Sequence, residues 1–183
     1  MTEPARKLMT IPEFLAWSER QDEGRYELAN GEIVAMAPER AEHGRAKAQI
    51  WRALADAIAR AGTPCEAFVD SLGVAVDAHT VYEPDVLVNC GETIAPEAML
   101  APSPTIIVEV LSPSSHTMDK SAKLAGYFRV ASLAHYLIVD LGRRAVLHYR
   151  RDAGATFLLE IVTEGSIRLD PPGLDLALKD FFA

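Results

Sequence analysis

The sequence has few cysteines, no long apolar run and no surplus of basic residues, and each of these absences excludes a class of protein. Its two cysteines, Cys65 and Cys90, lack the spacing of a metal-binding pair, which excludes a disulfide-rich scaffold and argues against structural zinc. No apolar stretch is long enough to cross a bilayer, and the first seven residues do not lead into the apolar segment of a signal peptide. We therefore expect a cytoplasmic protein with free thiols and no membrane partner.

Acidic residues outnumber basic ones, with 26 Asp and Glu against 18 Lys and Arg, and the formal net charge is −8. This balance excludes a general nucleic-acid coat protein, which would be basic, and argues against binding to anionic membranes. It does not exclude a metal-dependent enzyme with an anionic substrate, because a bound cation reverses the local field of an acidic site. The length of 183 residues and the apolar content of 49% fit one globular domain over residues 1–183.

Local signals predict two helices and a hairpin in the first third of the chain. Thr10-Ile11-Pro12-Glu13 has the pattern of a capping box, and it predicts a short helix that ends near Gly24. Asn30-Gly31 between two apolar runs predicts a β-hairpin. Apolar residues at helical spacing predict a longer helix from about Arg40 to Ala61, with Gly62 as its stop.

The rest of the chain reads as strands with two further helices. Apolar runs predict strands at 66–70, 73–76, 85–88, 105–111, 136–140, 145–150 and 156–162. Helices are expected from about 118 to 130 and, as a short closing element, from 176 to 182. This order predicts an α/β or α+β domain with a mixed central sheet flanked by helices.

Two acids, Asp85 and Glu109, lie within these apolar strand patterns. Carboxylates are depleted in strands and costly to bury without a partner. Asp85 could simply be solvated at a strand start, and Glu109 could pair with a buried arginine or face water at a sheet edge. If the two strands are neighbours, however, alternation lets both side chains point the same way. Because two adjacent carboxylates repel, that arrangement favours a divalent cation between them.

The predicted helix after Glu109 carries Lys120, Lys123 and Tyr127 at three- and four-residue spacing, so they share one face. Such a stripe is either a solvated basic face or a means for one lysine to reach the metal site.

Together these segments resemble a known pattern. They are Glu27-Leu28 with Gly31, Pro84-Asp85 with the apolar residues 86–88, Glu109-Val110-Leu111-Ser112-Pro113-Ser114, Lys123 with Tyr127, and residues 135–140. In this order they resemble the PD-(D/E)XK restriction-endonuclease-like superfamily, and within it a large, mostly uncharacterised bacterial family of predicted endonucleases whose lysine lies on a helix. The resemblance runs from Tyr26 to at least Asp140.

The chain departs from the pattern at three positions. Leu111 stands where the superfamily has its lysine, two residues after the acid, which makes Lys123 the candidate lysine. His135 and Leu137 replace a glutamate and a tryptophan in the strand that follows the helix. We expect these last two changes to affect packing or partner choice more than metal binding.

The resemblance implies a restriction-endonuclease-like fold and a Mg²⁺ or Mn²⁺ ion. The ion would be held by Asp85, Glu109 and the backbone carbonyl of Val110, and the attacking water or the developing charge would be held by Lys123. Glu27 would be a fourth acid, either behind the ligands or on a second metal. Its alternative is a half-exposed strand residue before a turn.

Candidate substrate contacts are His43, Lys120 and Tyr127. His43 opens the long helix and could contact phosphate, lie near the metal or be a surface residue. Tyr127 could equally be a packing or hydrogen-bonding support. The long helix also carries the cations Arg40, Arg45, Lys47 and Arg52. They form either a phosphate-binding helix start or a solvated face.

The function implied is a metal-dependent DNA endonuclease. The alternatives are a nuclease-fold binding or scaffold protein that does not cleave, and a hydrolase of another phosphoester. A homodimer is expected because nucleases of this type often pair two sites. The apolar tail from Leu174 to Phe182 could belong to such an interface or could close the monomer core.

Overall fold

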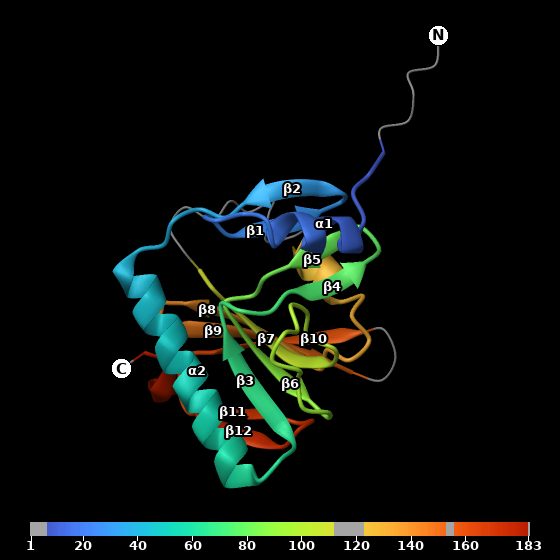
Figure 1. Cartoon of the computed structure of the whole chain (residues 1–183). Coiled ribbons are helices and arrows are strands. Elements are labelled where there is room, and N and C mark those ends of the chain that lie inside the picture. The colour runs from blue at the N-terminus through green and yellow to red at the C-terminus, as the bar shows by residue number, and fades with distance from the viewer. Residues whose placement is uncertain (1–6, 112–122, 153–155, 183) are drawn as a thin grey trace.

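The computed structural model describes residues 7–111, 123–152 and 156–182 (Figure 1). Its helices are α1 (Ile11–Ser18), α2 (Ala41–Ala61) and the 3₁₀ helix η1 (Leu178–Phe181), with a further helical turn over residues 123–127. Its strands are β1 (Tyr26–Ala29), β2 (Glu32–Ala35), β3 (Cys65–Val69), β4 (Val74–Asp77), β5 (Thr80–Tyr82), β6 (Val86–Cys90), β7 (Pro104–Val110), β8 (His135–Asp140), β9 (Ala145–Arg151), β10 (Phe157–Val162), β11 (Ser166–Leu169) and β12 (Leu174–Ala177).

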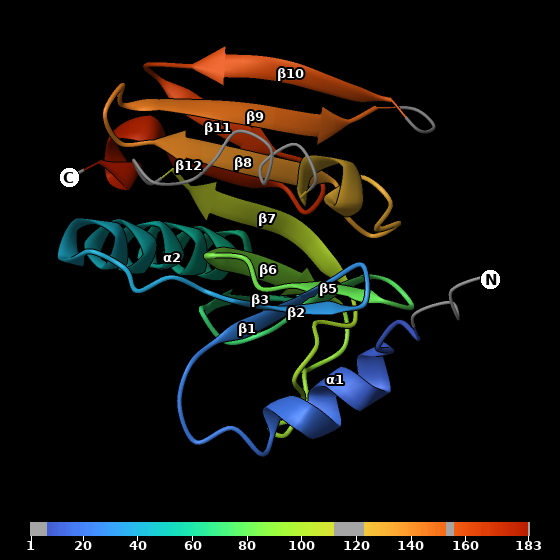
Figure 2. The ribbon, with the colours of Figure 1, turned by 90° about the horizontal axis from the view of Figure 1, so that it is seen from above.

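A six-stranded sheet in the order β10-β9-β8-β7-β6-β3 forms the centre of the molecule (Figure 2). The sheet is mixed, because β7 and β8 run parallel while their other neighbours are antiparallel. A four-stranded sheet, β2-β1-β5-β4, and the β11–β12 hairpin complete the strands of the described residues. The predicted α+β class with a mixed central sheet is therefore confirmed.

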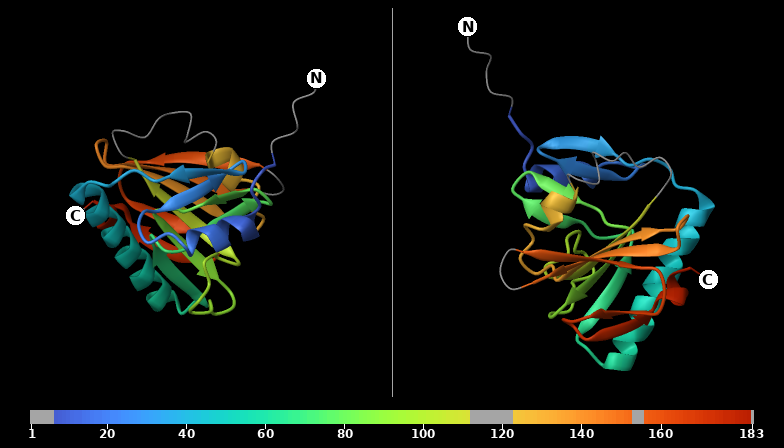
Figure 3. Two further views of the ribbon diagram at one scale, coloured as in Figure 1. Left: turned by 45° about the horizontal axis from the view of Figure 1, so that its top comes forward. Right: turned by 180° about the vertical axis from the view of Figure 1, so that it is seen from behind.

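One face of the six-stranded sheet is covered by α2, and the β11–β12 hairpin lies beside that helix (Figure 3). The helix forms where the sequence predicts it, and Gly62 closes it in the left-handed conformation, with φ 63°. Its buried positions recur at helical spacing: Ala46, Lys47, Ile50, Leu54, Ala57 and Ile58. Five of these six are apolar and pack on sheet residues such as Val86 and Val108.

The other face of the sheet packs against the helical turn of residues 123–127 and the smaller sheet. Tyr127, Tyr82 and Tyr136 lie in this second core, together with Leu87 and Ile107 from the middle of the large sheet. The two sheets and the start of α2 therefore meet around the start of β6 and the end of β7. The predicted site residues lie there.

The N-terminal signals act locally as expected. Thr10 and Glu13 form the capping box of α1, which ends at Ser18, earlier than predicted. Asn30 and Gly31 form the β1–β2 turn with φ 50° and 77°, the left-handed conformations that Asn-Gly turns adopt.

Several element predictions are wrong in detail. Strands β5 and β11 were not expected, and the predicted closing helix is instead β12 followed by η1. The apolar tail packs against α2 and closes the core, since Leu174, Leu176 and Phe181 are buried there. Asp85 lies one residue before β6 rather than inside the strand.

The expectation of free thiols is also wrong. Cys65 and Cys90 form a disulfide between β3 and β6, where the antiparallel register places them directly opposite each other. Their pairing depends on strand register, which their spacing in the sequence does not reveal. In the described ranges, the structure contains no helix with the length and apolarity that crossing a membrane requires.

Candidate active site

Asp85 lies at the point where β6 begins, held by groups from two other elements. Its Oδ2 accepts a hydrogen bond from the backbone N–H of Val110 at 2.6 Å and lies 3.1 Å from Nε2 of His43. Burial by itself would raise the pKa of Asp85, but the bonds from His43 and Val110 outweigh it and hold that pKa below its usual value. The same contact raises the pKa of His43. Asp85 is therefore ionised and fixed against the end of β7.

The pKa of Glu109, near the end of β7, is shifted in the opposite direction. The phenol of Tyr127 donates to its Oε1 at 3.0 Å, and the ammonium of Lys123 lies 3.5 Å from the same oxygen. Burial, with the charges of Asp85 and Glu27, raises the pKa of Glu109 to about 7 although Lys123 lowers it. At neutral pH the carboxyl of Glu109 is therefore only partly ionised.

Lys123 connects Glu109 with a third acid, from the smaller sheet. Its Nζ lies 2.7 Å from Oε1 of Glu27, which also accepts the backbone N–H of Glu83 at 2.8 Å. Glu27 is buried, so its alternative as a half-exposed strand residue does not hold. Glu27, Glu109 and Lys123 come from β1, β7 and the helical turn, and only tertiary folding brings them together.

Tyr127 is fully buried, with its ring against Tyr82 and Tyr136. Burial, with the charge of Glu109, raises its pKa well above the usual value, so the phenol stays protonated and donates to Glu109. These contacts describe a support for Glu109. Lys120, which shares the predicted face, lies outside the described residues.

A second network, which the sequence analysis missed, lies beside Asp85. Lys47 is 1% exposed, and its Nζ lies 2.6 Å from Oδ2 of Asp70 and 3.6 Å from Oδ1 of Asp85, with Glu39 as a third carboxylate partner. Arg25 binds Asp70 at 2.9 Å from the other side. The alternative in which the cations of this helix form a solvated face is therefore wrong for Lys47.

A signal for this network was present in the sequence. Lys47, Ile50 and Leu54 follow one another at three- and four-residue spacing, so Lys47 lies on the apolar face of α2. A lysine on a buried face requires carboxylate partners, and only the fold shows that these are Glu39, Asp70 and Asp85. Arg45 and Arg52 are exposed, as a solvated face requires.

Two overlapping donor sets could hold a cation. Asp85 and Glu109 offer hard oxygen ligands where β6 begins and β7 ends. Ligand atoms of Glu39, His43 and Asp85 lie within 4.8 Å of one another and add a nitrogen donor. The amide of Val110 is engaged by Asp85, and the role of its carbonyl as a ligand stays a prediction. The nearby charges of Asp85, Glu27 and Glu109 fit a divalent cation.

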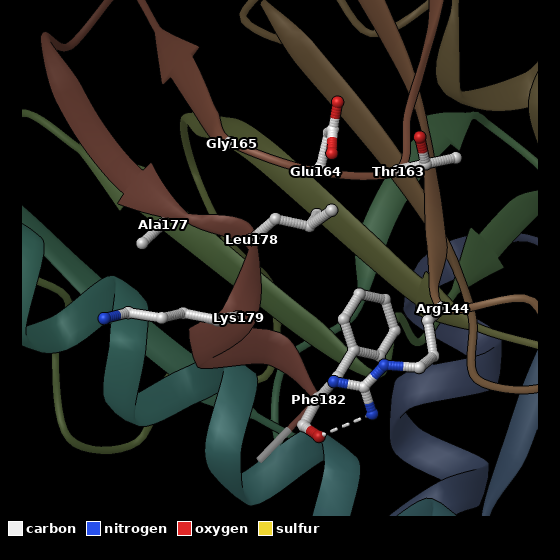
Figure 4. A pocket seen from close by; sticks show the side chains of 8 residues that line it. All are labelled: Arg144, Thr163, Glu164, Gly165, Ala177, Leu178, Lys179 and Phe182. Atoms are coloured by element: carbon white, nitrogen blue, oxygen red, sulfur yellow. Dashed lines mark hydrogen bonds between the residues drawn. The ribbon is translucent and has the colours of Figure 1, made fainter.

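A cavity of about 460 Å³ lies elsewhere, beneath η1 (Figure 4). It is lined by Arg144, Thr163, Glu164, Gly165, Ala177, Leu178, Lys179 and Phe182. Arg144 crosses it to donate to the backbone oxygen of Phe182. None of the candidate site residues lines this cavity, so we locate the site by its buried charges rather than by its concavity.

Comparison with known proteins shows the family to which this chain belongs. Residues 11–179 match the Uma2 family model, described as "Putative restriction endonuclease". Two uncharacterized proteins of Synechocystis sp. are similar: sll1609 is 30% identical over 84% of this chain and 86% of its own length, and slr1290 is 27% identical over 91% and 87%.

A crystal structure from Anabaena variabilis, described as a "putative nuclease belonging to DUF820", has the same fold. It superimposes with a TM-score of 0.73 over 95% of this chain and 97% of that one, at 17% sequence identity. The family match spans the small sheet, α2, the ends of β6 and β7 and the tail that closes the core. The chain belongs to the Uma2 family of the restriction-endonuclease-like superfamily.

Proposed function

We propose that this protein is a metal-dependent endonuclease that hydrolyses phosphodiester bonds in DNA. The family match supports a nuclease, and the observation that carries the metal dependence is the state of Glu109. Its partly buried carboxyl lies near Asp85, Glu27 and Lys123, and burial, with the charges of the two other acids, raises its pKa to about 7. A divalent cation, Mg²⁺ or Mn²⁺, would offset the charges of these three acids.

The residues have distinct roles in this proposal. A bound cation would supply a nucleophile at neutral pH and neutralise charge on the phosphodiester. Asp85 and Glu109 would hold it, with the carbonyl of Val110 as the proposed third protein ligand. Lys123, between Glu27 and Glu109, orients the attacking water or stabilises the developing negative charge. Glu27 holds the lysine in place.

His43 and Tyr127 each contact one of the two acids proposed as metal ligands. His43 contacts Asp85 from the start of α2, where a phosphate could also approach the helix N-terminus. Tyr127 fixes Glu109 through its hydroxyl. We propose both as positioning residues of the site. Because Tyr127 is fully buried, the candidate substrate contacts are His43 and Lys120.

The experiment is a cleavage assay on single- and double-stranded DNA with Mg²⁺ or Mn²⁺. We expect Asp85→Asn, Glu109→Gln and Lys123→Met each to reduce the rate at least 100-fold, because each removes a ligand or a charge at the reacting phosphate. Asp175→Asn is the matched control, since Asp175 is exposed on β12. Full activity without both Asp85 and Glu109 would show that the site is wrong.

A second candidate function is supported by two observations. Lys47 already lies against Glu39, Asp70 and Asp85 as an internal cation, and Leu111 stands at the usual lysine position. These features fit a nuclease-fold binding protein that does not cleave. Calorimetric titration with Mn²⁺ separates the two, because an enzyme takes up the ion at the wild-type site and loses this uptake in Asp85→Asn, whereas a degenerate site shows no uptake at all.

A further inference from the structure

Strand β10 is an edge strand with an apolar surface. Among the described residues, β9 is its one neighbour in the sheet. Figure 2 shows β10 at one end of the sheet and α1 beyond the other end. Leu158, Leu159 and Ile161 are 45%, 50% and 63% exposed, and they are half of the large hydrophobic residues that are exposed in the described part of the chain. Edge strands with free backbone groups and apolar side chains readily pair with another strand.

The alternation of β10 determines what kind of strand fits. Phe157, Leu159 and Ile161 point to one face, and Leu158 and Glu160 point to the other. In an antiparallel pair, two residues that lie directly opposite each other point their side chains to the same face of the sheet. When the added strand is an identical copy, this condition requires that the residue at the two-fold axis lie opposite its own copy. The two registers that overlap most of β10 place the axis at one of its two central residues, Leu159 or Glu160.

Charge distinguishes these two registers. With the axis at Glu160, that carboxylate lies directly opposite its own copy, which is unfavourable. With the axis at Leu159, the two leucines meet, and Phe157 lies opposite Ile161 of the partner subunit on the same face. This register joins three apolar pairs in a row, continuous with the half-buried Tyr149 and Leu147 on β9.

The Leu159 register also creates a favourable charge pair. Leu158 lies opposite Glu160 of the partner subunit, and on its other side it is paired with Arg150 of β9. Arg150 is exposed and lies about two strand spacings, or about 10 Å, from the partner's Glu160, a span that the two long side chains can bridge over Leu158. The two-fold axis produces this pair twice.

We propose that β10 is a self-association surface, on which a second copy of this chain adds its own β10 antiparallel with Leu159 at the two-fold axis. The pairing joins two six-stranded sheets into one sheet of twice the width. The occupant is a second copy because β10 complements itself in apolar pattern and, with Arg150, in charge. This proposal does not depend on nuclease activity, since no residue of the candidate active site takes part.

The first test is sedimentation velocity of the full chain between 1 and 100 µM. We expect a dimer of the 19.9 kDa chain, and we expect Leu159→Lys to weaken it at least 100-fold, because it places two ammonium groups at the axis. Val34→Lys is the matched control, since Val34 is a comparably exposed apolar residue on β2. A monomer at 100 µM, higher oligomers, or a dimer that survives Leu159→Lys would overturn the proposal.

The second test addresses the register and remains informative if Leu159→Lys unfolds. Glu160→Arg should weaken the dimer at least tenfold, and adding Arg150→Glu should restore it, because the charge pair is then reversed. In a Cys65→Ser/Cys90→Ser background, Leu159→Cys should form a disulfide-linked dimer on oxidation, whereas Glu160→Cys should not. Failure of the charge reversal to restore association, or cross-linking at 160 in preference to 159, would overturn this register.

Discussion

The residues at the start of β6 and the end of β7 differ in how their charges are compensated. Asp85 is ionised because His43 and the amide of Val110 bind it, whereas Glu109 shares one lysine with Glu27 and has a pKa of about 7. Lys47 adds a buried ammonium next to Asp85. Glu109 is the group whose charge differs from its state in water, because its pKa lies well above its usual value.

Lys47→Met should destabilise the protein strongly. Removing the ammonium leaves Glu39, Asp70 and Asp85 short of a partner, and breaking a buried ion pair by deleting one side costs about 3–5 kcal/mol. Urea unfolding measures the loss, with the exposed Lys179→Met as the control. A loss below about 1 kcal/mol would show that the network is not a structural one.

Metal affinity should increase with pH. Because burial raises the pKa of Glu109 to about 7, its proton competes with the cation below that pH, and binding releases it. We expect Mn²⁺ affinity to rise by up to about tenfold per pH unit from pH 6 to 7 and to level off above pH 7. Calorimetry in buffers of different ionisation enthalpy measures both affinity and proton release. Affinity that is constant from pH 6 to 8, with no proton released, would contradict the role of Glu109.

At the scale of elements, strand register creates contacts that no local pattern contains. His135 on β8 donates from Nε2 to the backbone oxygen of Pro171 at 3.0 Å, so its Nδ1 accepts from Nε2 of His148 on β9, at 2.9 Å. His135 stands where the resembling family has a glutamate, and the structure shows that it closes a buried contact between two strands and the turn before β12.

This histidine pair should make the fold sensitive to acid. Burial and the nearby His148 lower the pKa of His135 to about 4, and burial lowers that of His148. Between about pH 6.5 and 4 the unfolded chain binds protons that the folded chain does not. The free energy of unfolding therefore falls as the pH is lowered through this window, by roughly 3 kcal/mol for His135 in full.

Urea unfolding at pH 7, 6 and 5 measures this fall. The double variant His135→Leu/His148→Leu should flatten it, while the contribution of Glu109, which has the opposite sign, is present in both proteins and cancels in the comparison. Equal pH slopes in the two proteins would assign the effect to other groups.

The pairing of β3 with β6 predicts the state of the cysteines. Unreduced protein should show no reactive thiol even when unfolded, and two after reduction. Because the disulfide joins residues 25 apart in sequence, it should stabilise the fold by roughly 3 kcal/mol through loop closure. Urea unfolding with and without reductant measures this, and the Cys65→Ser/Cys90→Ser variant should not respond to reductant. Two thiols in the unfolded, unreduced chain would contradict the pairing.

At the scale of the whole molecule, the net charge of −8 narrows what the protein can bind without a metal. Some of the acid excess is concentrated at the candidate site, in Glu27, Glu39, Asp85 and Glu109. Phosphate contacts from Lys and Arg dominate non-specific DNA affinity, and here acidic residues outnumber these basic ones.

Metal-free protein should therefore bind DNA weakly. We expect a dissociation constant above about 10 µM at physiological salt. The affinity should fall steeply as the salt concentration increases. Fluorescence anisotropy with labelled duplex and single strands measures it, in EDTA and then with Ca²⁺, which should strengthen binding if the cation occupies the acidic centre. Tight metal-free binding at physiological salt would contradict this account.

The sequence by itself determined most of the helices and strands and the family. Helical spacing and Gly62 predicted α2, Asn30-Gly31 predicted the first hairpin, and the order of elements predicted a mixed sheet, because these features depend on neighbours within a few residues. Asp85 and Glu109 stood out in the sequence because carboxylates within apolar strand patterns require a partner, and Lys123 stood out through the family resemblance.

Only the tertiary structure decided how these residues are used. Which carboxylate is ionised, where Lys47 finds its partners, that Cys65 meets Cys90 and that the tail packs against α2 all depend on contacts between segments far apart in the chain. Such contacts follow from sheet order and register. These are set by the packing of the whole core, and no local pattern in the sequence encodes them.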